Sequence, residues 1–60
     1  MKALRTSNGW YVHELRGASF VTWVSRGDKE HALQIPDNKA NGLQNYVWEA
    51  TRVDTEIVDM

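Results

Sequence analysis

Apolar side chains occupy both faces of a segment whose pattern is typical of a β-hairpin. Its strands are predicted at residues 10–15 and 19–25, joined by a short connection that contains Gly17. Strand side chains alternate between two faces, so Phe20 and Trp23 lie on opposite faces and neither face is purely polar. A small sheet normally packs one face on the core. We therefore expect the second face to be covered by another element or kept for a partner.

The stretch after the hairpin allows two interpretations. In the preferred one, Asp28 is the N-cap of a short helix over residues 29–34 that ends before Pro36. The alternative places a turn at residues 26–29 and a third strand after it, within an all-β meander. The residues that would alternate along this third strand are His31, Leu33 and Ile35.

The last third of the chain also divides into two interpretations. Turn formers predict a loop over residues 36–42, followed by one or two strands over residues 46–58 with a bulge near residues 51–52. The alternative is a helix over residues 38–50. It ranks second because a glycine inside a helix, here Gly42, costs about 1 kcal/mol.

Together these elements predict an α+β fold, a small antiparallel ββαβ sheet with one short helix, with an all-β meander or small barrel as the alternative. Sixty residues suffice for one domain, residues 1–60. A core of this size rarely supplies more than about 3–5 kcal/mol without disulfides, metals or oligomerisation. The chain has no cysteine, so a homodimer is one way in which it could bury more surface.

The charge pattern restricts the classes of partner. Seven Lys and Arg residues face eight Asp and Glu residues, and the basic residues are scattered along the chain. The absence of a basic stripe argues against nucleic acid as a partner. The first residues lack the apolar region of a signal peptide, and no segment approaches the length of a membrane span. We expect a cytoplasmic protein with no membrane partner.

No group of residues has the spacing of a catalytic, cofactor-binding or metal site, and we predict none of these. His13 and His31 lack further ligands at the spacing that a metal requires. The serines lack the sequence context of an activated nucleophile or a phosphate-binding loop. A short chain also has little room for a deep pocket. We therefore do not expect an enzyme.

Aromatic residues carry the strongest functional signal. The chain holds three Trp, two Tyr and one Phe. Trp and Tyr with a nearby Arg form the hot spots of many protein interfaces, and acidic residues of the last strand would steer the chain towards a basic surface. The candidate partner-binding residues are Trp10, Tyr11, Arg16, Trp23, Asp54 and Glu56.

Three segments resemble small proteins of bacteriophages and mobile elements. They are a strand that begins Ser-Phe (residues 19–24), a helix with an Ala-Leu pair (residues 28–33) and a closing strand with Thr-Arg-Val (residues 48–53). In this order they resemble the small RNA polymerase inhibitors of T-odd coliphages, although Pro36 interrupts the helix and the loop over residues 36–42 is longer. The resemblance implies an inhibitor that acts in the host cytoplasm, and it carries no binding residue over to this chain.

The residues and the resemblance together predict a small interaction protein without enzymatic activity. It would bind a host protein sterically, through a sheet edge or an aromatic face. The alternative function is a small dimeric regulatory module that binds nucleic acid.

Overall fold

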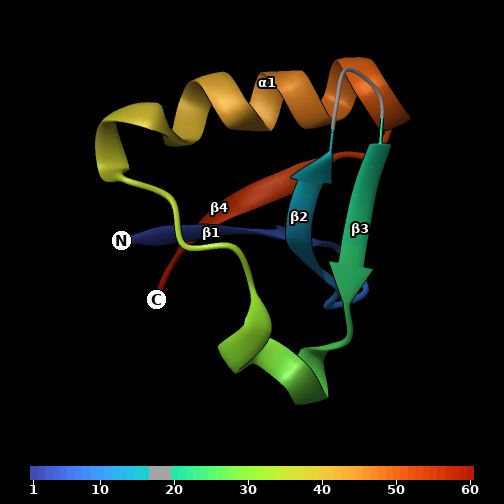
Figure 1. Cartoon of the computed structure of the whole chain (residues 1–60), viewed down its shortest axis with the longest axis vertical. Coiled ribbons are helices and arrows are strands. Elements are labelled where there is room, and N and C mark those ends of the chain that lie inside the picture. The colour runs from blue at the N-terminus through green and yellow to red at the C-terminus, as the bar shows by residue number, and fades with distance from the viewer. Residues whose placement is uncertain (17–19) are drawn as a thin grey trace.

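The computed structural model describes residues 1–16 and 20–60 and shows a four-stranded antiparallel sheet with one α-helix packed on it (Figure 1). The strands are β1 (Lys2–Thr6), β2 (Tyr11–Arg16), β3 (Phe20–Val24) and β4 (Thr55–Asp59). Between β3 and β4 lie the 3-10 helices η1 (Arg26–His31) and η2 (Asp37–Lys39) and the helix α1 (Ala40–Thr51). The predicted α+β class, with a small antiparallel sheet and one short helix, is confirmed. The connection predicted at Gly17 lies outside the described residues.

The sheet consists of two antiparallel ribbons that meet at a corner. Its strand order is β3-β2-β1-β4. β1 pairs along its whole length with β4, and β2 pairs along its length with β3, but β1 and β2 share only the pair Arg5 and Tyr11. Figure 1 shows the two ribbons crossing at a steep angle. The corner lies next to the turn over residues 7–10, and this position determines where the site described below can form.

Strand β1 was missed by the sequence analysis, although it lies inside the sheet. Leu4 is fully buried. The charged residues that obscure the strand pattern are paired across the ladder with β4: Lys2 with Asp59, and Arg5 with Glu56. Because β4 lies at the other end of the chain, no local signal could show that these charges would be matched.

Helix α1 covers one face of the sheet. Its apolar residues Ala40, Leu43 and Val47 follow helical spacing and pack on the side chains of β1 and β2, where Leu4 and Val12 are fully buried. None of the helices within the described residues is long and apolar enough to cross a membrane.

The predicted loop over residues 36–42 and the strand before residue 55 were wrong, and the second-ranked helix is correct. The end of the predicted strand region, from residue 55, is confirmed as β4. Gly42 lies in α1, and a Cβ there would meet nothing within 4 Å. Glycine therefore destabilises the helix only through its low helix propensity. Burial of Val47 outweighs that cost. The expected bulge is also absent: Arg52 ends α1 in the left-handed conformation, with φ 60°, and its N–H donates to the carbonyl of Trp48.

The segment after β3 is helical, but it differs from the predicted helix. It forms the 3-10 helix η1, which begins before Asp28 and ends at His31. The backbone that follows η1 lies against the corner of the sheet. The N–H of Leu33 donates to the carbonyl of Val12 at 2.8 Å, and Ile35 and Lys2 form two backbone hydrogen bonds with each other, each of 2.8 Å. This pairing prevents a helix up to residue 34. It also reduces the alternative third strand to a single bridge at Ile35.

The two faces of the hairpin are covered by different elements, and a β-bulge changes the face of one residue. The register of β2 against β3 shifts between Val12 and Glu14, so Leu15 returns to the α1 side although it has the same parity as Tyr11. On the opposite face, Ala32 packs on the Tyr11 end. The other end stays open. The second face is therefore covered only in part.

Candidate functional site

The turn between β1 and β2 fixes the position of Trp10. The N–H of Thr6 donates to the Trp10 carbonyl at 2.7 Å, and the N–H of Trp10 donates to the Thr6 hydroxyl at 3.0 Å. Gly9 makes the turn possible with a φ of +91°, and a Cβ there would lie 3.3 Å from the side chain of Arg26. Trp10 is therefore held by its backbone while its ring stays 45% exposed.

An open groove of about 620 Å³ lies beside this ring. Its walls come from the β1–β2 turn, from β3 and from the connection between α1 and β4. The described residues that line it are Thr6, Ser7, Asn8, Trp10, Trp23, Val53 and Asp54. We call it the Trp10–Trp23 groove. It lies at the corner of the sheet, and no short stretch of sequence contains it.

The Trp10–Trp23 groove combines apolar surface with one carboxylate. The two indole rings and Val53, which is 37% exposed, supply the apolar surface. Trp23 is half-buried because its other side packs on the core beneath α1. Asp54 is exposed and forms no ion pair with any other residue of the described part of the chain. A groove with this lining can hold an apolar group that carries a positive charge.

Three of the six predicted partner-binding residues line this groove: Trp10, Trp23 and Asp54. Tyr11 does not, because it is only 4% exposed and packs with Ala3 and Ala32 on the opposite face. The prediction that Tyr11 belongs to an exposed partner surface is therefore wrong. Ala3 of β1 and Ala32 after η1 cover this side chain, and alternation within the hairpin could not show that cover.

The other two predicted residues are held in ion pairs away from the groove. Arg16 lies at the far end of β2, where its Nε donates to the Glu14 carboxylate at 2.6 Å. Glu56 pairs with Arg5 across the β1–β4 ladder. Asp54 is therefore the acidic residue of the chain end that remains available, because Asp59 is paired as well.

The ion pairs of the strands shift the acidity of two carboxyl groups. The hydrogen bond from Arg16, together with its charge, lowers the pKa of Glu14. The hydrogen bond and charge of Lys2 lower the pKa of Asp59 in the same way. Both carboxylates are stabilised by partners within the fold, which leaves them less suited to binding a partner.

Sequence reasoning missed the polar wall of the groove. Ser7, Asn8 and Gly9 are turn-forming residues, and the structure places Ser7 and Asn8 beside Trp10. Val53 was assigned to a strand, whereas it follows α1 in the connection to β4. The turn signal before an aromatic residue was the local evidence available. The approach of Val53 depends on the helix that the sequence analysis ranked second.

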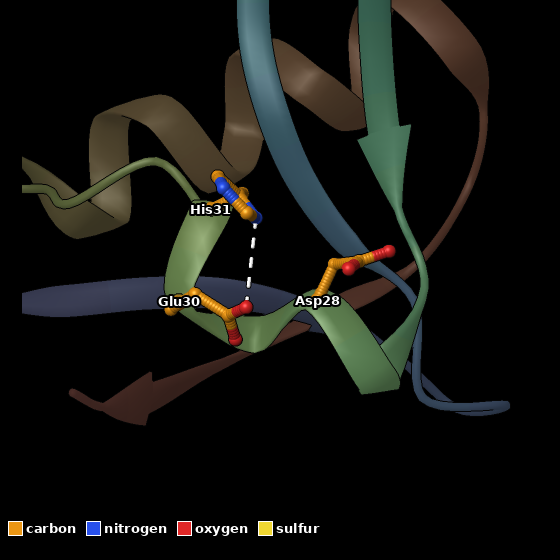
Figure 2. A group of neighbouring side chains, drawn as sticks. All are labelled: Asp28, Glu30 and His31. Atoms are coloured by element: carbon orange, nitrogen blue, oxygen red, sulfur yellow. Dashed lines mark ion pairs between the residues drawn. The ribbon is translucent and has the colours of Figure 1, made fainter.

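A second cluster of polar side chains lies on η1, where Asp28, Glu30 and His31 are all exposed (Figure 2). Nδ1 of His31 lies 3.7 Å from Oε1 of Glu30. Their ligand atoms are spread over distances of up to 4.8 Å. Tetrahedral zinc with bonds of about 2.1 Å needs ligand atoms about 3.4 Å apart. The 3.7 Å between His31 and Glu30 exceeds this spacing, and exposed acidic groups are common without a metal, so we assign no metal site to the cluster.

Comparison of the chain with protein families, with curated proteins and with solved structures found no match.

Proposed function

We propose that this chain is a protein-binding module without enzymatic activity, which engages its partner through the Trp10–Trp23 groove. The observation that carries the proposal is the meeting of two accessible indole rings with a carboxylate that has no ion pair among the described residues. Trp residues at the centre of an interface contribute much of its binding energy, because they bury a large area when water is expelled.

The shape of the groove favours a protein segment over a small substrate. Small-molecule sites are concave and enclose about 70–90% of the ligand surface, whereas this groove is shallow and open to solvent. Its described lining offers hydroxyls, an amide and one carboxylate, but no imidazole or amine that would activate a hydroxyl as a nucleophile. The groove is suited to binding and not to a chemical step.

The chemistry of the groove favours a partner that presents a Lys or Arg side chain. The cation would lie over an indole face, which contributes about 0.5–2 kcal/mol, while the Asp54 carboxylate pairs with its charge. The chain provides an internal example of the first contact: the Arg52 guanidinium lies 4.4 Å from the centre of the Trp48 ring. An apolar residue next to the cation in the partner would fill the space beside Val53.

In this proposal the chain acts by occupying a surface of its partner and blocking other contacts there. The resemblance to phage inhibitors makes a protein of a bacterial host the first partner to test. No covalent change to the partner is required.

The experiment is a capture from bacterial lysate with the tagged chain and matched variants. We expect one stoichiometric protein with the wild type. Trp10→Ala should reduce its capture about tenfold or more, and Asp54→Asn should reduce it several-fold while weakening its dependence on salt. Trp48→Ala is the matched control, since Trp48 is 39% exposed and does not line the groove.

Circular dichroism must first show that each variant is folded. Equal capture by a folded Trp10→Ala variant would exclude the groove as the binding surface. Capture that disappears after nuclease treatment would favour the nucleic-acid alternative instead.

A further inference from the structure

Strand β3 forms an edge of the sheet, and its outer side has no backbone partner within residues 1–16 and 20–60. The strand order leaves β3 hydrogen-bonded to β2 alone, and Figure 1 shows no element beside its outer side. At the other edge, the side chain of Gln44 donates to the carbonyl of Thr55 at 2.7 Å. The two edge strands therefore differ. Within the described residues, a side chain of the chain itself binds the backbone of β4, whereas none binds the outer backbone of β3.

The composition of β3 lacks the devices that usually protect an edge strand. Natural edges carry Lys, Pro or bulges that prevent pairing with other chains. The sequence of β3 is Phe-Val-Thr-Trp-Val, with no charge and no proline. The register shift of the hairpin lies in β2, on the inner side. Phe20, at the end of β3, is 59% exposed. An unprotected edge with an exposed aromatic residue is suited to pairing.

We propose that the occupant of this edge is a second copy of the chain, which pairs its own β3 antiparallel to the first about a two-fold axis through Thr22. The two sheets then become one continuous sheet. The register that overlaps the whole strand places Phe20 opposite Val24 of the second copy. It also places Val21 opposite Trp23 of that copy, and the two Thr22 residues opposite each other.

This register is self-complementary in size and charge. Aromatic residues face β-branched ones, and Thr faces Thr, which are favourable cross-strand pairs. No charged residue of β3 meets its own copy, because the strand has none. The exposed ring of Phe20 gains a neighbour on the face that Ala32 leaves open. A two-fold interface requires this kind of self-match, and a foreign strand would find no charge on the edge to recognise.

The size of the edge sets the expected affinity. A five-residue strand offers less than the roughly 800 Å² per partner of a stable complex. We therefore expect a weak dimer with a dissociation constant between about 10 μM and about 1 mM. Dimerisation depends on the backbone edge of β3 and shares only Trp23 with the groove, so it can hold or fail separately from the proposed function.

The test places charges on the two-fold axis. The side chain of Thr22 is half-buried, lies on the face opposite Trp23, and belongs to neither core cluster. Thr22→Lys and Thr22→Glu, each alone, should remain monomeric because like charges meet across the axis. Their equimolar mixture should dimerise, because opposite charges then meet. Asn45→Lys, which adds the same charge on the exposed side of α1, should behave as wild type.

The measurement is sedimentation velocity from about 5 μM to about 500 μM, a range that brackets the expected dissociation constant. The wild-type mass should rise from 6.9 kDa towards twice that value. A wild type that remains monomeric at the highest concentration overturns the proposal. So do Thr22→Lys and Thr22→Glu variants that each dimerise alone as the wild type does.

A second measurement uses the wild type alone, in case the variants do not fold. Outward-pointing amide protons of β3 should exchange more slowly with solvent as the chain concentration rises, because pairing protects them. Amide protons of the turn over residues 7–10 should not change. Exchange in β3 that is independent of concentration would contradict pairing through this edge.

Discussion

At the scale of single residues, two glycines illustrate how the same residue type has opposite roles. Gly9 has a φ of +91° in the turn that holds Trp10, and a Cβ would approach Arg26 to 3.3 Å. Gly42 lies on the exposed side of α1, where an added Cβ would have no neighbour within 4 Å. Only the first position needs glycine, because L-residues are strained in the left-handed region.

Gly9→Ala should lower the free energy of unfolding by about 1–2 kcal/mol, through backbone strain at a positive φ. Gly42→Ala should raise it by about 0.5–1 kcal/mol, because alanine loses less conformational entropy in a helix. Urea denaturation of both variants measures the two changes. Shifts of the same sign would show that the turn or the helix is assigned wrongly.

At the scale of elements, packing decides α1 more than local signals do. Its N-cap residue, Lys39, makes no side-chain capping bond, and its first turn holds no acidic residue. It also contains Gly42. The helix is stabilised where Val47, fully buried, meets the sheet. This is why the sequence alone favoured a loop here.

Val47→Ala should therefore destabilise the chain by about 2–3 kcal/mol, the usual cost of removing a buried branched side chain. Since a core of this size supplies only about 3–5 kcal/mol, far-UV circular dichroism should show partial loss of helix at ambient temperature. Asn45→Ala, at an exposed position of the same helix, should change stability by less than about 0.5 kcal/mol. Equal effects of the two substitutions would argue against the packing of α1 on the sheet.

At the scale of the whole molecule, the ladder between β1 and β4 joins the two ends of the chain. Lys2 pairs with Asp59 and Arg5 with Glu56, and the N–H of Met60 donates to the carbonyl of Met1 at 3.2 Å. Figure 1 shows the two termini on the same side of the molecule. The charges of these strands therefore act in the folded state and not within either segment alone.

The lowered pKa of Asp59 predicts a loss of stability in acid. A carboxyl group whose pKa is lower in the folded state stabilises the fold above its ordinary pKa, and this contribution is lost as the pH falls through the lowered value. The free energy of unfolding of the wild type should therefore decrease below about pH 4. Asp59→Asn should reduce this dependence in urea denaturations across the acidic range.

Asp54→Asn is the matched control for this measurement, because Asp54 has no ion pair among the described residues. It should leave the acid dependence close to that of the wild type. An Asp59→Asn variant with an unchanged acid profile would show that the pair with Lys2 contributes nothing measurable in solution.

The sequence by itself determined the parts of this protein that depend on neighbours in the chain. Alternation and turn residues located the β2–β3 hairpin, and the α+β class was predicted from this hairpin together with a short helix. Trp10, Trp23 and Asp54 were selected for their chemistry. These inferences use side-chain period and residue type, which are local properties.

Only the tertiary structure decided the rest, because each remaining feature depends on residues far apart in the chain. β1 is a strand since β4 matches its charges, and α1 is a helix since the sheet buries Val47. The bulge in β2 brings Leu15 to the α1 side, and Ala3 and Ala32 bury Tyr11 on the other face. The Trp10–Trp23 groove forms because two ribbons meet at a corner beneath the end of α1, bringing three separate segments together. Long-range pairing and burial supply the free energy for these arrangements, and no local pattern encodes them.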